Sequence, residues 1–315
     1  MLIDFHTHVH LQDILTEKYW RGWVGVAHVQ SGVPKEKIRR KIESTGFTNW
    51  GCDELIRDMD EGGIDKALII AVDLGWCKEI GTLDITWEDL HKPIIEGVRK
   101  YPNRLLAECG IDPRRPNAVQ LLEKAVKEWG VKGVKLVPYC GVAPNDRVCY
   151  PLWEKAQELG IIIHIHTGTE PYPFRNKWSQ PMFVDDVACD FPDVQIVMAH
   201  CGMWEWQQAM TVAVQKPNVW VDLTAWQQWA HTNLVEFFRA IRTMCDWMGY
   251  RRIMIGSDWP AVSLLMGEKR WFDVFRDIPD EIQAAGIEFK EKEIDGILGD
   301  NAARLLGLIP GEVGF

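Results

Sequence analysis

LIDFHTH, which spans residues Leu2–His8, is a short apolar run that ends in two histidines. The same pattern, an apolar run that ends in a metal-ligand side chain, recurs in IIIHIH (Ile161–His166), QIVMAH (Gln195–His200) and RIMIGSD (Arg252–Asp258). Successive side chains of a β-strand point to opposite faces, so His6 and His8 point the same way and can bind one ion together. If the four strands are parallel members of a closed barrel, their carboxyl ends meet at one mouth, where such barrels carry their active sites.

The rest of the chain alternates between apolar runs and helical patterns. We expect strands at 2–5, 66–72, 105–111, 133–137, 161–166, 195–199, 219–223 and 253–257, with a helical pattern between each strand and the next, among them 87–100, 150–159 and 204–214. This alternation predicts an α/β fold, a (β/α)8 TIM barrel. A doubly wound parallel sheet is the alternative, but it would not gather the first, fifth, sixth and eighth strands at one place.

Residues 10–51, between the first strand and its helix, form a segment that is too long for an ordinary loop of such a barrel. The segment is polar and rich in Trp and Gly, and we interpret it as a lid or small subdomain over the mouth. No linker, repeat or low-complexity stretch suggests a second domain. The prediction is therefore one domain over residues 1–315, with 10–51 as an insertion.

The composition is that of an acidic globular protein. The chain has 45 acidic and 35 basic residues, and its net charge of −10 argues against a nucleic-acid or anionic-membrane partner. No signal peptide is visible at the N-terminus, and no apolar run approaches the ~20 residues of a membrane-spanning helix. The eight cysteines form no CxxC pair, which is typical of reduced thiols. We expect a soluble, cytoplasmic protein.

The order of the motifs resembles that of a known family. Asp-x-His-x-His at the N-terminus, His-Thr-Gly after the fifth strand, Ala-His-Cys-Gly after the sixth and Gly-Ser-Asp-Trp-Pro after the eighth are similar to motifs of the amidohydrolase superfamily. The chain resembles, over nearly its whole length, the branch that includes aminocarboxymuconate-semialdehyde decarboxylase and related hydrolases and hydratases. The resemblance implies a metal-dependent barrel that acts on a small carboxylated molecule. By position it implies four metal ligands, His6, His8, His166 and Asp258, with His200 as the catalytic acid/base beside the metal.

The residue types agree with that ligand set. Three imidazoles and a carboxylate suit Zn²⁺, with Mn²⁺ or Fe²⁺ as alternatives, and leave a position open for water. We expect one ion per chain. Lys135, on the fourth strand, stands where binuclear amidohydrolases carry a carboxylated bridging lysine; the chosen branch usually lacks that bridge, so Lys135 is either structural or a cation for the substrate. His164 is expected to be a hydrogen-bonded core residue or a support for a ligand.

Candidate substrate contacts lie on the loops that follow the strands. Arg175, in the loop after the fifth strand, offers a guanidinium group that suits a substrate carboxylate, and Lys177 is a second cation there. Trp178 lies in the same loop, whereas Trp226 and Trp259 follow the seventh and eighth strands. We expect these rings to wall the pocket and to stack a planar or unsaturated acid.

Two reactions fit this site. In the first, hydrolysis, a metal-activated water attacks an amide, ester or lactone, Asp258 takes the proton of the water, and His200 relays it or stabilises charge. In the second, non-oxidative decarboxylation or hydration, His200 or Asp258 delivers a proton to carbon. Because the same groups serve both reactions, the fold and the metal site cannot separate them. We take hydrolysis as the first interpretation and a carboxy-lyase or hydratase as the alternative, with a small molecule as the partner and a homodimer suggested by the family resemblance.

Overall fold

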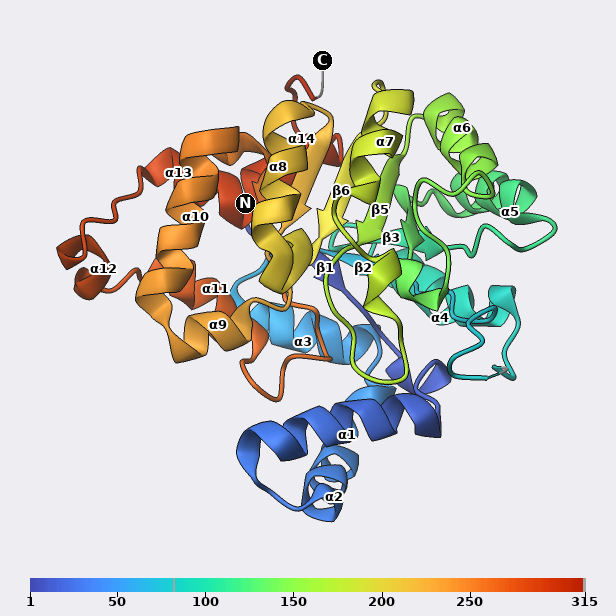
Figure 1. The fold of residues 1–315 in the computed structure, drawn as a ribbon, viewed down its shortest axis with the longest axis horizontal. Coiled ribbons are helices and arrows are strands. Elements are labelled where there is room, and N and C mark those ends of the chain that lie inside the picture. Colours follow the sequence, from blue (N-terminus) through green and yellow to red (C-terminus); the bar gives the residue numbers. More distant parts are fainter. Residues whose placement is uncertain (82, 314–315) are drawn as a thin grey trace.

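Eight parallel strands form the centre of the computed structural model, which describes residues 1–81 and 83–313 (Figure 1). The strands are β1 (Ile3–Thr7), β2 (Lys66–Ile70), β3 (Leu105–Gly110), β4 (Gly133–Leu136), β5 (Ile162–His166), β6 (Ile196–Ala199), β7 (Val219–Asp222) and β8 (Ile253–Met254). Each strand pairs in parallel with the next one along the chain. The backbone N–H of Phe5 donates to the carbonyl of Ile255 (3.1 Å), which brings β1 against the segment after β8 and nearly closes the barrel. The predicted (β/α)8 barrel is confirmed.

Helices follow the strands and cover the outside of the barrel (Figure 1). They are α1 (Glu17–Ser31), α2 (Lys35–Thr45), α3 (Cys52–Gly62), α4 (Trp87–Lys100), α5 (Ala118–Lys124), α6 (Tyr150–Leu159), α7 (Phe183–Asp190), α8 (Trp206–Gln215), α9 (Gln227–Thr232), α10 (Leu234–Met248), α11 (Glu268–Arg276), α12 (Asp280–Ala284), α13 (Glu291–Asp295) and α14 (Asn301–Leu305). Among the described residues, no helix combines the length and the apolar character needed to cross a membrane.

Strand alternation divides the core into two layers. On β4, Val134 and Leu136 belong to the large apolar cluster between strands and helices, whereas Lys135 between them lines the cavity at the mouth. A second cluster, which includes Phe5 and Trp220, fills the barrel interior and packs against the α14 alanines. The amino-terminal half of the interior is therefore closed by apolar side chains, and polar side chains are left to the carboxyl ends of the strands.

Two predicted boundaries near the mouth were wrong. The last strand, expected over 253–257, ends at Met254 because the N–H of Ile255 donates to the carbonyl of Ile297 and no longer pairs with β7. The helix expected over 204–214 begins at Trp206, because residues His200–Glu205 form a 3-10 turn with left-handed backbone at Cys201 (φ 45°) and Met203 (φ 50°). The first change alters the direction of the loop that carries Asp258, and the second alters the direction of the loop that carries His200.

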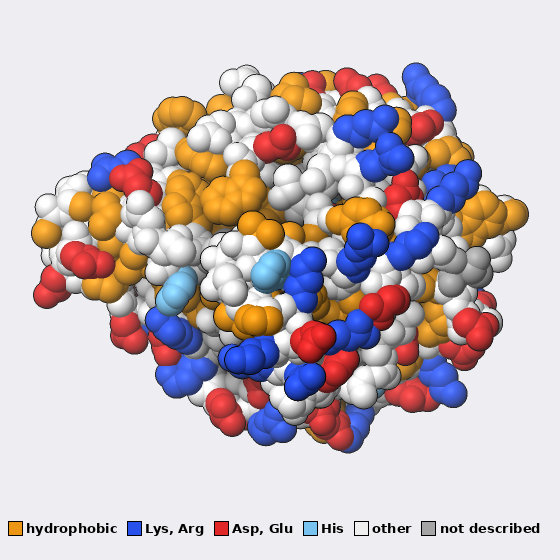
Figure 2. Space-filling view, turned by 60° about the horizontal axis from the view of Figure 1, so that its bottom comes forward, with side chains coloured by type: hydrophobic (Ala, Val, Ile, Leu, Met, Phe, Trp, Pro, Cys, Tyr) orange, Lys and Arg blue, Asp and Glu red, His pale blue; other side chains and the backbone are white. Residues whose placement is uncertain are grey.

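The segment 10–51 forms the pair of helices α1 and α2 at the bottom of Figure 1. Helix α1 docks closely on the loop after β5, since a Cβ atom added to Gly22 would lie 1.7 Å from the carbonyl oxygen of Tyr172. Figure 2 turns this end of the molecule toward the reader and shows Lys and Arg side chains interspersed with acidic and hydrophobic ones. The segment therefore packs over the loops of the mouth, and its action as a lid stays a prediction.

Candidate active site

A cavity lies at the carboxyl ends of the strands. Its polar side chains come from five strands or the loops that follow them: His6, His8, Lys135, His166, Glu170, His200 and Asp258. Its apolar wall includes Leu11, Ile14, Leu15 and Trp23 from the segment 10–51, and Val72, Val137 and Tyr139 from loops after β2 and β4. An apolar wall beside a few convergent polar groups is typical of a small-molecule site.

Two groups of metal-ligand side chains among the described residues have one ligand atom from each member within 4.8 Å of the others: His6, His8 and Asp258, and His6, His200 and Asp222. The Nδ1 atom of His8 lies 2.8 Å from the carbonyl oxygen of Ile70, which can only accept, so we assign the ring proton to Nδ1. The Nε2 lone pair of His8 then faces Asp258 Oδ1 at 3.2 Å. Two acceptors at this distance need a proton or a cation between them. This contact fits a metal ion.

A second chain of hydrogen bonds assigns the protons of His200 and His166. His200 Nδ1 lies 3.3 Å from the carbonyl oxygen of Thr224, so His200 donates there and leaves Nε2 as an acceptor. That Nε2 lies 3.1 Å from His166 Nδ1, which must then be the donor. His166 Nε2 is buried without a hydrogen-bond partner, as is His6 Nε2. Each of these two imidazoles therefore offers a free lone pair, which a ligand to a cation requires.

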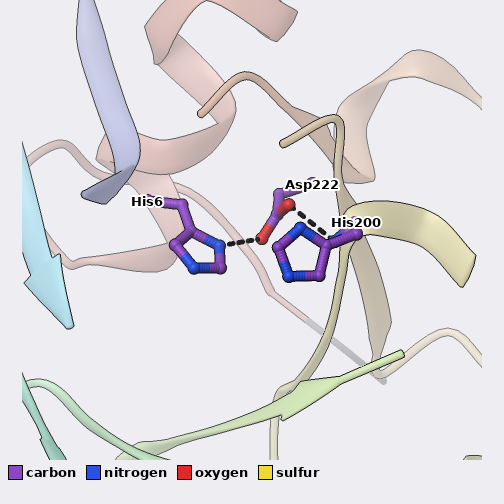
Figure 3. Close-up of side chains that lie close together, drawn as sticks. All are labelled: His6, His200 and Asp222. Atoms are coloured by element: carbon purple, nitrogen blue, oxygen red, sulfur yellow. Dashed lines mark hydrogen bonds and ion pairs between the residues drawn. The ribbon is translucent and has the colours of Figure 1, made fainter. Parts of the chain in front are cut away.

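Asp222, the last residue of β7, fixes this arrangement (Figure 3). One carboxylate oxygen accepts from His6 Nδ1 at 3.0 Å and lies 3.1 Å from His164 Nε2, and the other accepts from the backbone N–H of His200 at 2.8 Å. Burial acts to raise the pKa of Asp222, but its interactions with His6 and His164, which include a hydrogen bond to each ring, outweigh burial and hold this pKa well below its usual range. Asp222 is thus an ionised acceptor whose oxygens are already engaged, and it orients His6 rather than binding metal itself.

Burial also decides the charge states of the imidazoles. It lowers the pKa of His200 to about 4, with the carboxylate of Asp258 opposing the shift. Burial likewise lowers the pKa of His6 and of His166 well below the usual range. All three rings are neutral at pH 7, as metal ligands and a general base must be.

The backbone is strained at two of these residues. His200 (φ 63°) and Asp258 (φ 57°) both adopt the left-handed region, which non-glycine residues rarely occupy. The N–H of Asp258 donates to the carbonyl of His6 (2.9 Å), so this conformation is held by β1. Such strain clusters at functional sites, where the surrounding structure maintains it.

Two further ionisable groups face the cavity. Burial lowers the pKa of Lys135 to about 8, and nearby carboxylates, Asp222 first among them, oppose the shift. Burial, followed by the charge of Asp258, raises the pKa of Glu170 to about 8, so this group is a carboxylic acid at neutral pH. Tyr19 of α1 donates to Glu170 Oε2 at 3.1 Å, and Glu170 Oε1 lies 3.8 Å from His166 Nε2.

The structure brings together three of the four expected metal ligands, His6, His8 and Asp258, within one group. His166 lies outside that group but lines the same cavity, as does the expected acid/base His200. His164 lies beneath the cavity with both ring nitrogens engaged, by Glu108 (2.8 Å) and by Asp222 (3.1 Å). The free lone pairs of His6 and His166 and the acceptor pair at His8 fit a divalent ion.

The expected substrate contacts lie elsewhere. Arg175 is 70% exposed and pairs with Glu79, and Trp178 packs under Lys177 in the same loop. Trp226 and Trp259 are buried, and their indole N–H groups donate to the carbonyl of His200 and to Asp58. None of the four expected contacts, Arg175, Trp178, Trp226 and Trp259, is among the described residues that line the cavity. Their role in substrate binding stays a prediction without support from this geometry.

Several polar residues of the site were missed in the sequence. Asp222 ends an apolar run, VWVD, in the same strand-end position as the histidines of β5 and β6, and this signal could have been used. Glu108 lies within β3, two residues before its end, so the strand-end rule would not have found it. Tyr19 and Glu170 gave no such signal, because their meeting depends on how α1 docks against the loop after β5.

These features define a (β/α)8 barrel with a cluster of histidines and a carboxylate at its mouth. The sequence matches the model of the Amidohydrolase family over residues 3–308, so the chain belongs to that family, as predicted, and is an enzyme of the amidohydrolase superfamily. It is 24% identical to 2-amino-3-carboxymuconate-6-semialdehyde decarboxylase of Dictyostelium discoideum, over 98% of this chain and 92% of that protein. It is also 36% identical to L-fucono-1,5-lactonase of Burkholderia ambifaria, over 24% of this chain and 30% of that protein.

A solved structure of similar fold is a variant of 5-carboxyvanillate decarboxylase from Novosphingobium aromaticivorans. It superposes with a TM-score of 0.67 at 16% identity and covers 98% of this chain and 97% of that chain. That structure holds manganese and 3-methoxy-4-hydroxy-5-nitrobenzoic acid. At this level of identity the comparison shows the shared fold.

Proposed function

We propose that the protein is a metal-dependent, non-oxidative decarboxylase of a small planar or unsaturated carboxylic acid. The observation that carries this proposal is the likeness, over 98% of the chain, to the Dictyostelium decarboxylase. The sequence motifs had placed hydrolysis first and decarboxylation second, and this relative supports the opposite order. The cavity, walled by apolar side chains beside the histidines, suits a small planar acid.

His6, His8, His166 and Asp258 would hold one divalent ion per chain, with zinc preferred for three imidazoles and one carboxylate and manganese as the alternative. When bound, the ion would supply a Lewis acid for an oxygen atom of the substrate. The lone pairs left free on His6 and His166 support this assignment. Elemental analysis of protein purified without added metal tests it: one ion per chain is expected, and two would refute the mononuclear site.

His200 is the residue that would move the proton. In decarboxylation the bond from carbon to carboxylate breaks, the electron pair stays on the carbon, and that carbon must then gain a proton as CO₂ leaves. His200 lines the cavity, and its Nδ1 is tied to the carbonyl of Thr224, so Nε2, which accepts from His166 Nδ1 at 3.1 Å, is the nitrogen that would carry the proton. Because burial lowers the pKa of His200 to about 4, the protonated ring is a strong acid and gives its proton readily to a basic carbon. The ring is neutral at the start, so this proton must first come from the substrate or from water.

Release of CO₂ separates the two reaction classes. Purified protein would be incubated with a panel of hydroxybenzoic and unsaturated dicarboxylic acids, and separately with lactones and amides of similar size. The proposal expects CO₂ from at least one acid, with loss of that activity in His200→Ala. New acid groups from a lactone or amide, without CO₂ from any acid, would refute it.

Hydrolysis remains the second candidate because of one observation, the 36% identity with a lactonase over 87 residues. In that reaction Asp258 would take a proton from the attacking water, and His200 would relay it. The lactones in the panel test this candidate directly.

A further inference from the structure

Lys135 is a buried cation without a partner. Its side chain is on β4, the residue is 3% exposed, and its Nζ atom makes no hydrogen bond. Of the described residues that line the cavity, it is the one lysine or arginine. A buried ammonium group without a hydrogen-bond acceptor strongly destabilises the folded protein. Such a group is therefore expected where a bound ligand supplies the acceptor.

The carboxylates around Lys135 are engaged with other residues. Asp222 accepts from His6 and from the backbone of His200. Asp258 faces His8 at 3.2 Å, and the carboxylic acid of Glu170 accepts from the hydroxyl of Tyr19. Glu108 Oε2 lies 2.8 Å from His164 Nδ1, whereas its Oε1 has no hydrogen-bond partner. None of these four acidic groups hydrogen-bonds to Nζ. The ammonium group is therefore available to an anion that enters the cavity.

We propose that Lys135 binds a carboxylate of the substrate that is retained in the product, so that the substrate class is a planar dicarboxylic acid. This inference rests on the proposed decarboxylase function. A carboxylate that departs as CO₂ must lose its negative charge in the transition state, and an ammonium bound to it would stabilise the ground state and slow the reaction. A retained carboxylate keeps its charge throughout, so binding it positions the substrate without this cost.

The walls of the cavity suit the rest of such a molecule. Val137 and Tyr139 follow Lys135 on the same strand and loop, and both line the cavity. The Tyr139 ring stands edge-on to the ring of His166, with centroids 4.8 Å apart. A planar body that has one carboxylate on Lys135 would lie along this apolar wall and present its other carboxylate toward the histidines.

Binding of isophthalate, compared with 3-carbamoylbenzoate, tests the inference without requiring turnover. The second ligand keeps the ring and one carboxylate and replaces the other carboxylate by a neutral amide. Calorimetric titrations would use the metal-loaded wild type, Lys135→Met, Lys135→Arg and a surface control, Lys127→Met, which changes a lysine that is 64% exposed. Loss of a charge-assisted hydrogen bond corresponds to about a 10- to 150-fold change in affinity.

The wild type and Lys127→Met should prefer isophthalate by that factor. Lys135→Met should lose the preference while it keeps its metal content and its affinity for 3-carbamoylbenzoate, and Lys135→Arg should recover part of it. An unchanged preference in Lys135→Met would overturn the inference, and so would equal loss of both ligands and of metal, which would mark Lys135 as structural. A ¹³C-labelled carbamate on Lys135 together with two metal ions would also overturn it. If no acid released CO₂, in contrast, the proposed decarboxylation would be refuted, and the role of Lys135 in binding a carboxylate would still be decided by the titrations.

Discussion

Replacing Asp222 by Asn should disable the metal site although Asp222 binds no metal. The asparagine has the same shape, and its oxygen can still accept from the backbone N–H groups of His200 and Thr224. Its amide nitrogen then faces His6 Nδ1 at the place of the carboxylate oxygen, 3.0 Å away in the wild type. Two N–H groups cannot face each other, so the proton of His6 moves to Nε2 and blocks the lone pair that a metal would use.

The size of the effect follows from this change of tautomer. Loss of a residue that orients a metal-binding histidine typically weakens metal affinity by about 10- to 100-fold, or about 1.4–2.7 kcal/mol. Competition with a chelator for Zn²⁺ would measure the affinity, and thermal unfolding would show whether the variant is folded. Asp246→Asn is a matched control, since it removes one carboxylate charge on α10, where the side chain is 58% exposed. A folded Asp222→Asn protein that binds Zn²⁺ within threefold of the wild type would refute the tautomer argument.

Three other predictions address the acid/base, the docking of α1 and the pH dependence of stability. His200→Ala should lose ~10²–10⁴-fold in turnover and should bind metal more weakly than the wild type, because His166 Nδ1 loses its acceptor, but more tightly than His166→Ala, which loses a ligand. Metal content and CO₂ release would measure both variants, and the reverse order of metal retention would exchange the two roles. Tyr19→Phe leaves the half-buried Glu170 without its donor and should lower the free energy of unfolding in urea by about 1–3 kcal/mol, whereas Tyr172→Phe, at a residue that is 56% exposed, should not. Burial lowers the pKa of His91 to about 4, so the unfolded chain binds more protons and stability falls by up to about 1.4 kcal/mol per pH unit as pH drops from about 6.5 to 4. His91→Gln should flatten that part of the curve, and an unchanged slope would contradict the assignment.

The fold could be predicted in detail because the local signals agree with one another. Helix α4 has the predicted bounds, since Thr86 accepts a hydrogen bond from the N–H of Asp89 and begins it. Helix α6 also has them and ends before Gly160, which adopts a left-handed φ of 64°. The strands were recognised by apolar runs buried on both faces. These signals act over a few residues, and a single sequence contains them.

The pocket walls could not be predicted, because they depend on contacts between distant segments. Trp226 and Trp259 follow strand ends, as pocket residues do. Their indole N–H groups donate to the carbonyl of His200 and to Asp58, and both rings lie in the core instead of in the pocket wall. Trp259 also stacks on Trp50, whose ring lies 5.6 Å away and comes from the segment 10–51. That segment supplies much of the actual wall, and no strand or helix pattern places its side chains over the mouth.

The same limit explains why the sequence could not rank the histidines. His6, His164 and His166 all sit in apolar strands. Alternation points His164 and His166 into the barrel, whereas His6 follows the interior residue Phe5 and reaches the cavity because the register of β1 shifts between Asp4 and Thr7. What separates them is the number of partners: both nitrogens of His164 are engaged, by Glu108 and Asp222, so it has no lone pair for an ion. His6 and His166 each have one nitrogen fixed by a hydrogen bond and one left free. A ligand histidine is therefore one whose proton is held on the far side of its ring, and the acceptors that hold it there, Asp222 for His6 and His200 for His166, lie on other strands.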